Sequence, residues 1–453
     1  MQLAIIGAGY VGLVTSACLA HLGHHVTCLD IDTARVDRLR SGDLPVHEPG
    51  LDELVAAGLE NGRLRFDSDV RAIEPCELAI VCVGTLDAQE EWSGDIVRAT
   101  VRDIAADARL PRMIVIRSTL MPGTAAAIAD EVRGIDASVR IAHNPEFTRE
   151  AVAVSDFLEP DRVVIGVDGH DDGAAGTALV AALRHVYAPL SAPVMVTDLT
   201  SAETIKLASN VFLAAKITFA NELARLAAST GADVNAVVDG MGLDKRIGRN
   251  FLSPGPGFGG SCFPSQARAL PSLAHGFGVQ TPLIDAIWPS NLAQSEWLVE
   301  GLEAVAGRHI GGMRIALLGL TFKAGTDDLR ESPALRLGEV LLRRGADLSV
   351  FDPMALEPGA RRLRAFADAA GLKGSVLTAT SAAAACAGAD AVVLATEWPE
   401  FKLLDWQRIA TTMSGRVVID GRHILDVELA RAAGLRVLSL GVETREGAGL
   451  PAK

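Results

Sequence analysis

Residues 3–12 read Leu-Ala-Ile-Ile-Gly-Ala-Gly-Tyr-Val-Gly, and this stretch decides the fold of the first part of the chain. Its apolar run leads into Gly7, Gly9 and Gly12, which have the Gly-x-Gly-x-x-Gly spacing. Between a strand and a helix, this spacing allows a tight turn, a close approach to a pyrophosphate and a helix N-terminus facing it. Asp30 ends the next apolar run, where a carboxylate accepts from a ribose hydroxyl and favours NAD over NADP. Together these residues predict a dinucleotide-binding turn, against the alternative of a merely tight strand-to-helix connection.

Further short apolar runs alternate with helical patterns along the chain. They lie at residues 25–30, 78–83, 113–119, 162–167, 313–320, 347–352, 391–396 and 417–420. Runs of this kind between helices indicate parallel sheets that are buried on both faces. We therefore expect an α/β protein with two Rossmann-like, doubly wound parallel-sheet domains, an NAD-binding one at 1–198 and a C-terminal one at 306–453. Because the second lacks the Gly-x-Gly-x-x-Gly spacing, we expect no second dinucleotide there.

A long helical segment lies between these two domains. From residue 202 to 228 there is no proline or glycine, and apolar residues recur every three to four positions. Thr200 and Glu203 have the spacing of a capping box at its start. We expect a central helical domain at 199–305, with a long helix that connects the domains and supports a dimer.

The composition narrows the function classes. The 453 residues include 42 basic and 56 acidic ones, a formal net charge of −14, which argues against nucleic acid or anionic membrane as partner. The six cysteines form no Cys-x-x-Cys pair, and no His/Cys spacing suggests a metal site. Residues 3–20 are uncharged, but glycines interrupt them and no basic segment precedes them, so we expect neither a signal peptide nor a membrane span. These features predict a cytoplasmic protein.

Cys262 is the candidate nucleophile. It lies in the glycine- and proline-rich loop at residues 254–264, just before an expected helix, and a thiol at a helix N-terminus tends toward the thiolate. The alternative is a buried, inert cysteine, which we expect for Cys18, Cys28 and Cys82.

Two weaker constellations are each ambiguous alone. Lys206 and Asn210 are four apart on the expected long helix and share a face, as any solvated polar stripe does. The segment 144–150 follows a strand end, where α/β sites gather, yet it also reads as a charged turn.

A third constellation lies in the second sheet domain. Lys323 and Arg330 precede a helix expected from about residue 332, so they can hold a phosphorylated group. The alternative is ordinary surface charge.

Together, these motifs resemble the UDP-glucose 6-dehydrogenase family, within the nucleotide-sugar dehydrogenases, over nearly the whole chain. The family's order is followed by GAGYVG at 7–12, NPEF at 144–147, the segment 203–222, PGPGFGGSCF at 254–263, GLTFK at 319–323, TDDLRESPA at 326–334 and TEW at 396–398. The resemblance implies oxidation of the C6 alcohol of UDP-glucose to the carboxylate of UDP-glucuronate with two NAD+. A nucleophile is needed because an aldehyde yields a second hydride only after addition, and a thiolate gives a thiohemiacetal and then a thioester that water cleaves.

The resemblance also implies catalytic roles. Cys262 is the nucleophile, Lys206 stabilises the oxyanion, and Asn210 holds the alcohol oxygen or a water. Thr119 and Glu146 match positions near the reacting carbon, and Glu146 is the candidate base for thioester hydrolysis.

Binding residues follow from the same resemblance. Cofactor contacts are expected at Gly7, Gly9, Tyr10, Val11, Gly12, Asp30, Arg35, Thr85, Thr119, Glu150 and Arg330. Substrate contacts are expected at Glu146, Phe147, Glu150, Lys206, Asn210, Arg246, Phe251, Phe258, Gly259 and Lys323. Arg246 matches an arginine that reaches the substrate of a neighbouring subunit, which implies a homodimer or higher homo-oligomer.

One departure affects the expected mechanism. The family's loop usually continues Cys-Phe-Pro-Lys-Asp, whereas this chain has Gln266 four residues after the cysteine. Gln266 can orient a water but cannot take a proton. Three hypotheses remain: a working enzyme in which Lys206, Glu146 and water cover the missing carboxylate; an enzyme for another nucleotide sugar or oxidation level; and a weakly active paralogue that binds nucleotide sugar and NAD.

Overall fold

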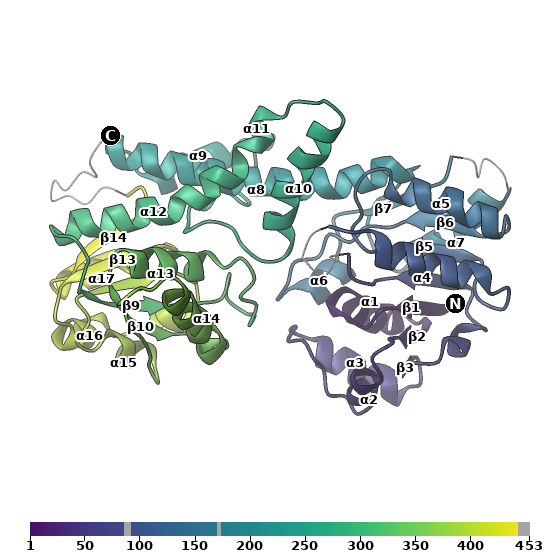
Figure 1. Cartoon of the computed structure of the whole chain (residues 1–453), viewed down its shortest axis with the longest axis horizontal. Helices are drawn as coiled ribbons and strands as arrows, with labels where there is room; N and C mark the ends of the chain where they lie inside the picture. The colour runs from purple at the N-terminus through teal and green to yellow at the C-terminus, as the bar shows by residue number, and fades with distance from the viewer. Residues whose placement is uncertain (86–91, 170–173, 443–453) are drawn as a thin grey trace. The chain divides into compact units, whose positions relative to one another are not determined.

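The computed structural model describes residues 1–85, 92–169 and 174–442 (Figure 1). The chain divides into two compact units, Met1–Ser209 and Asn210–Lys453, and the division falls inside helix α8 (Leu199–Thr230). Each unit contains one sheet. Residues 443–453 of the expected third domain lie outside the described residues.

The first unit is built on an eight-stranded sheet in the order β3-β2-β1-β4-β5-β6-β7-β8. Neighbouring strands are parallel except β6 and β7, which are antiparallel. The strand order reverses between β1 and β4, and ligands of doubly wound sheets bind beyond the carboxyl ends at such a point. The strands are β1 (Gln2–Ile6), β2 (His25–Leu29), β3 (Leu64–Asp67), β4 (Leu78–Val81), β5 (Met113–Ile116), β6 (Arg140–His143), β7 (Val163–Val167) and β8 (Val194–Asp198).

Helices cover both faces of this sheet. Leu3 and Ile5 of β1 belong to one buried core, with α1, α3, α6 and α7, whereas Ala4 belongs to another, with α4 and α5. Two-sided burial explains why the strands read as continuous apolar runs. The helices are α1 (Tyr10–His21), α2 (Thr33–Arg40), α3 (Leu51–Glu60), η1 (Val70–Ile73), α4 (Asp95–Ala106), α5 (Thr124–Ile135), α6 (Ala153–Leu158) and α7 (Ala174–Val186).

Helix α8 has 32 residues and confirms the long helix expected from the sequence. The capping box predicted for Thr200 and Glu203 is wrong. β8 ends at Asp198 and the helix begins at the next residue, so the Asp198 carboxylate accepts from Ser201 N at 2.8 Å. Thr200 already lies inside the helix, and Glu203 bonds to another element.

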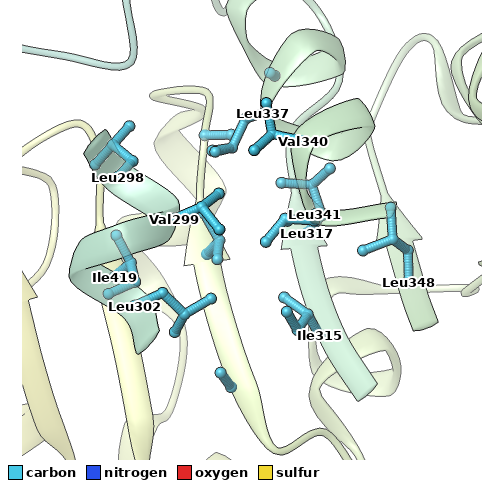
Figure 2. Close-up of a cluster of buried hydrophobic side chains, with 14 of the residues drawn as sticks. Leu298, Val299, Leu302, Ile315, Leu317, Leu337, Val340, Leu341, Leu348 and Ile419 are labelled. Atoms are coloured by element: carbon cyan, nitrogen blue, oxygen red, sulfur yellow. The ribbon is translucent and has the colours of Figure 1, made fainter. Parts of the chain in front are cut away.

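The second unit is built on a six-stranded parallel sheet in the order β11-β10-β9-β12-β13-β14. Figure 2 shows Leu298 and Leu302 of α12 and Leu337 of α13 packing over strand residues such as Leu317. The strands are β9 (Arg314–Leu318), β10 (Asp347–Phe351), β11 (Val376–Thr378), β12 (Ala391–Leu394), β13 (Val417–Asp420) and β14 (Arg436–Ser439). Both expected α/β sheets are thus confirmed.

The helices of the second unit after α8 are α9 (Val234–Gly242), α10 (Cys262–Gly276), α11 (Pro282–Asp285), α12 (Ile287–Ala306), α13 (Pro333–Arg343), α14 (Leu356–Ala369), α15 (Ala382–Cys386), η2 (Pro399–Leu403), α16 (Trp406–Thr412) and α17 (Val427–Ala432). None of the helices in the described part of the chain combines the length and apolarity needed to cross a bilayer.

Candidate functional site

The glycine-rich turn has the geometry of a phosphate-binding loop. Gly7 has φ +101°, and a Cβ at Gly12 would lie 1.8 Å from the carbonyl oxygen of Gly7. Helix α1 therefore packs against its own loop only because residue 12 has no side chain. Gly9 is the N-cap of α1, and a Cβ there would meet no atom within 4 Å. The loop leaves room for a phosphate at a helix N-terminus, with Tyr10 and Val11 in the first turn.

Asp30 is held next to this loop by three donors. Ala8 N donates to one carboxylate oxygen at 2.8 Å and Arg35 Nη1 to the same oxygen at 3.0 Å, while Asp32 N donates to the other at 2.9 Å. A carboxylate has about four acceptor sites, so it can still accept from a ribose hydroxyl. The loop and Asp30 fit NAD.

Glu48 connects the start of α1 to the segment after β6. Its buried carboxylate accepts from the Tyr10 hydroxyl, from Ala151 N at 2.8 Å and from Ala153 N at 2.7 Å. Ala151 has φ +64°, a strained value for alanine that these bonds help to hold. Burial is the larger cause and the hydrogen bond to Glu48 the next; together they raise the pKa of Tyr10 far above its ordinary value. The sequence analysis missed Glu48, because no motif around it indicates a functional residue.

Lys206 and Glu146 form a buried ion pair. Nζ of Lys206 lies 2.8 Å from Oε1 of Glu146, and the two side chains are 2% and 7% exposed. Thr148 donates to the other oxygen of Glu146 from N at 2.6 Å and from Oγ1 at 2.7 Å. Burial by itself would raise the pKa of Glu146, but Lys206 and Thr148 outweigh it and hold that pKa at about 2. Glu146 is therefore an anionic partner of Lys206 and a poor proton acceptor while the pair is intact.

The other residues expected in the first unit follow the carboxyl ends of neighbouring strands. Thr85 comes after β4 and Thr119 after β5, while Phe147 and Glu150 follow β6. The Arg162 guanidinium lies 3.9 Å from the centre of the Phe147 ring. The topology thus brings these residues to the edge of the sheet that carries the glycine loop.

Asn210 is the first residue of the second unit and lies one helical turn after Lys206 on α8. Its side chain is buried. The two residues therefore share a helix face, as their spacing predicts, and this face is not a solvated stripe.

Cys262 begins helix α10, with Ser261 as its N-cap, and is exposed. The other five cysteines are buried. Burial raises the pKa to about 12 for Cys18, Cys28, Cys82 and Cys386. Cys262 is thus accessible at a helix N-terminus, and Cys18, Cys28 and Cys82 are buried as expected; that Cys262 is the nucleophile stays a prediction.

The loop before Cys262 is fixed by side-chain amides. Asn221 Oδ1 accepts from Gly255 N at 2.8 Å, Gln294 Nε2 donates to Gly255 O at 3.0 Å, and Asn291 Oδ1 accepts from Phe258 N at 2.8 Å. The sequence reasoning missed Asn291 and Gln294, since polar residues on a helix are usually solvent-facing. These amides make the loop rigid where the thiol is presented.

Gly259 and Gly260 bring this loop against the segment after β9. A Cβ at Gly259 would lie 2.4 Å from Glu331 O, and Gly260 N donates to Arg330 O at 3.0 Å. Gly259 is thus required for close backbone packing. Lys323 Nζ lies 5.5 Å from the centre of the Phe322 ring.

The remaining predicted residues have varied surroundings. Phe258 is buried, with its ring centre 6.0 Å from that of Trp288, whereas Phe251 has φ +65° and its ring lies 6.2 Å from Phe263. The guanidinium groups of two exposed arginines are paired with a carboxylate two residues earlier, as seen in Arg246 with Asp244 and Arg330 with Asp328.

Gln266, which replaces the family's acid, is buried one turn after Cys262. Its Oε1 has no hydrogen-bond partner among the described residues. A buried acceptor without a donor costs about 1–3 kcal/mol, so this oxygen is suited to accept from a ligand or a water. Across residues 1–85, 92–169 and 174–442 there is no group of three or more His, Cys, Asp or Glu that could hold a metal ion.

The glycine loop with Asp30 in the first unit, and an accessible cysteine at a helix N-terminus in the second, are features of an NAD-dependent oxidoreductase. The chain belongs to the UDP-glucose/GDP-mannose dehydrogenase family. Residues 1–191 match the family's NAD binding domain, 200–293 its central domain and 316–427 its UDP binding domain. The second sheet, which lacks the dinucleotide loop, thus corresponds to the UDP binding domain.

Individual relatives match over nearly their full length. A UDP-glucose 6-dehydrogenase from Rickettsia conorii is 39% identical over 448 residues, covering 97% of this chain and 99% of the relative. One from Rhizobium meliloti is 40% identical over 446 residues, with the same coverage. The structure of a UDP-glucose dehydrogenase from Pyrobaculum islandicum superimposes with a TM-score of 0.84 at 35% identity and covers 98% of each chain.

Proposed function

We propose that this protein oxidises UDP-glucose to UDP-glucuronate with two NAD+, through a thioester on Cys262. The observation that carries the proposal is the single exposed cysteine, which begins α10 behind a rigid glycine loop in a chain of this family. The named relatives support UDP-glucose as substrate.

Bound NAD supplies a hydride acceptor, and the chain supplies the remaining steps. After the first oxidation, the Cys262 thiolate adds to the C6 aldehyde, forming a C–S bond and an oxyanion. The Lys206 ammonium donates to that oxyanion. The oxyanion then re-forms the C=O bond as C6 gives up a second hydride, for which a second NAD+ would be the acceptor, and the product is the thioester. Water then attacks C6, the C–S bond breaks, the cysteine leaves as a thiolate, the carboxylate is released, and both protons of the attacking water pass to solvent.

Glu146 and Gln266 orient groups in this scheme. The pKa of about 2 makes Glu146 the counter-ion that directs Lys206, in place of the base expected from the sequence. The unpartnered Oε1 of Gln266 accepts from a water or from the sugar hydroxyl. The amide of Gln266 cannot take the proton that the C6 alcohol loses in the first oxidation, so this proton passes to water.

The test is the number of NADH formed per UDP-glucose consumed to completion, with identification of the sugar product. We expect two NADH and UDP-glucuronate from the natural protein. Cys262→Ser should bind NAD normally and form no carboxylate, whereas Cys76→Ser, at a buried cysteine, serves as the matched control. Carboxylate production by Cys262→Ser would refute the covalent route. An absence of NADH from the natural protein, despite NAD binding, would refute UDP-glucose as substrate.

We further propose a homodimer formed through α8. Phe212, Phe219 and Leu226 are 66%, 47% and 59% exposed and recur every seven residues, so they form one apolar stripe along the helix. Exposed apolar stripes of this kind mark protein interfaces. The exposed Arg246 is then available to a second subunit, as the family resemblance implies.

We infer the cytoplasm as the compartment. All six cysteines are free thiols, which suits a reducing environment.

A further inference from the structure

Glu203 is a buried carboxylate that caps a helix other than its own. It lies on α8 and is fully buried. Its Oε2 accepts from Gly123 N at 2.6 Å and its Oε1 from Ala125 N at 2.7 Å. Gly123 is the N-cap of α5, has φ +94° and offers no side chain of its own. Glu203 therefore supplies the acceptor that an N-cap residue normally provides.

The capped end of α5 belongs to the loop that carries Thr119. This loop runs from the end of β5 at Ile116 to Gly123. Ser118 Oγ donates to Val83 O at 2.6 Å, which holds the first half of the loop to the segment after β4. The bonds to Glu203 hold its second half, so Thr119 lies between two fixed points.

The same face of α8 also holds the neighbouring loop. Lys206 is one helical turn after Glu203 and bonds to Glu146, which follows β6. Strands β5 and β6 are hydrogen-bonded neighbours. Helix α8 thus sets the spacing between the loop with Thr119 and the segment with Glu146 through two buried, charged side chains.

We propose that Glu203 is a positioning residue, which places the Thr119 loop relative to the Lys206–Glu146 pair for the oxidation. The inference rests on the proposed function, because Thr119 and Lys206 belong to the proposed site. Glu203 touches no reacting atom in this scheme; it acts through the backbone of the loop.

The electrostatics give this role a pH dependence. Burial, with a smaller contribution from Asp198 at the end of β8, raises the pKa of Glu203 to about 7, although the two backbone donors lower it. Among the described residues, Asp198 is the charged neighbour that raises the pKa of Glu203. The first turn of α5 has no acidic side chain. The nearby Lys206 ammonium is bonded to Glu146. The two backbone donors favour the carboxylate, because a protonated carboxyl has one carbonyl oxygen for two N–H donors. These loop contacts are therefore strongest above about pH 7, although burial of the charge makes the fold as a whole less stable there.

The first measurement is hydrogen–deuterium exchange of peptides spanning residues 119–126 in the full-length protein. Glu203→Gln keeps the shape but leaves one acceptor for two donors, so we expect at least about tenfold faster exchange at Gly123 and Ala125. Val132→Ala, in the buried last part of the same helix, is the matched control that destabilises α5 without touching these bonds. Unchanged exchange in Glu203→Gln would overturn the proposal.

The second measurement separates positioning from a merely structural role. We expect Glu203→Gln to lower kcat with UDP-glucose about tenfold to a hundredfold, with the KM for NAD within about threefold. The rise of kcat through about pH 7 should disappear from its profile but remain in Val132→Ala. Equal losses of kcat in both variants would overturn the proposal. If the natural protein forms no NADH, the proposed function fails. The exchange rates at Gly123 and Ala125 in Glu203→Gln still show whether Glu203 holds the loop. Glu203→Asp, which keeps the charge but is one methylene shorter, replaces Glu203→Gln if that variant does not fold.

Discussion

Replacing Lys206 by methionine tests the buried ion pair most directly. At the observed 2.8 Å, the attraction between the two charges is about 6 kcal/mol for an effective dielectric constant of about 20. Part of this is offset by the cost of burying both charges, so the measured loss of stability should be about 3–5 kcal/mol. Lys206→Met has nearly the same volume, and the loss therefore reports the uncompensated Glu146 carboxylate.

The pH dependence of this loss can be worked out from the pKa of Glu146. In the natural protein that pKa is about 2, below its ordinary value of 4.5, so Glu146 contributes stability above pH 4.5 that is lost as pH falls toward 2. Without Lys206, burial dominates and the pKa should move above 4.5. The variant should then lose stability as pH rises through that new value, and the deficit should be larger at pH 7.5 than at pH 4.5.

The assay is urea denaturation of the full-length protein at both pH values, as a double-mutant cycle with Glu146→Gln. The double variant has no buried charge at this position, so its loss should be at least about 1 kcal/mol smaller than the sum of the single losses. Because the chain has two units, the transition that shifts with the mutations is the one to compare. Additive losses within about 0.5 kcal/mol, or a deficit independent of pH, would refute the reasoning.

Three further outcomes are expected. Gln266→Asp should raise the rate of the first oxidation about tenfold in single-turnover NADH formation, since a carboxylate can take the proton; a slower reaction would show that the site depends on the amide. Asp30→Ala should raise the Kd for NAD about tenfold and narrow the preference over NADP in calorimetric titrations, because the ribose acceptor is lost and Arg35 is released; an unchanged preference would contradict this role. Phe219→Asp should shift sedimentation from dimer to monomer, whereas Leu403→Asp, at an even more exposed apolar residue on η2, should not; a monomeric natural protein would refute the dimer proposal.

The strands that the sequence predicts differ from those it misses by their place in the sheets. All nine predicted strands are present, and four of the five others, β3, β8, β11 and β14, are the edges of the two sheets. An edge strand is buried less, so its apolar pattern is weaker: Met195 and Val196 of β8 are both exposed. The fifth, β6, has four residues that begin with Arg140 and end with the buried His143, and such a short mixed segment carries no clear period.

Site residues were predictable where the chemistry is local. The glycine loop, Cys262 at the start of α10 and the shared face of Lys206 and Asn210 each follow from spacing within a few turns of chain. Glu203 and Glu48 bond to amides 80 and 103 residues away, and their sequence neighbourhood contains no sign of those partners. The capping box was misread for this reason, because a spacing of three residues says nothing about a competing donor in another element.

Several loops of the first unit are held by carboxylates that accept from backbone amides, and this feature helps to explain the role proposed for Lys206. Each loop must stay open toward a ligand, so apolar burial cannot fix it on that side. Carboxylates fix it instead: Asp30 bonds to Ala8 N, Glu203 to the end of the Thr119 loop, and Glu48 to the segment after Glu146. Two of these four carboxylates also bond to a side-chain cation, Asp30 to Arg35 and Glu146 to Lys206. Arg35 is partly exposed, whereas Lys206 is buried. A lysine ammonium has three donors, and Glu146 takes one of them while directing the others. In the proposed mechanism, this orientation lets Lys206 stabilise the oxyanion at C6 without any rearrangement of the lysine.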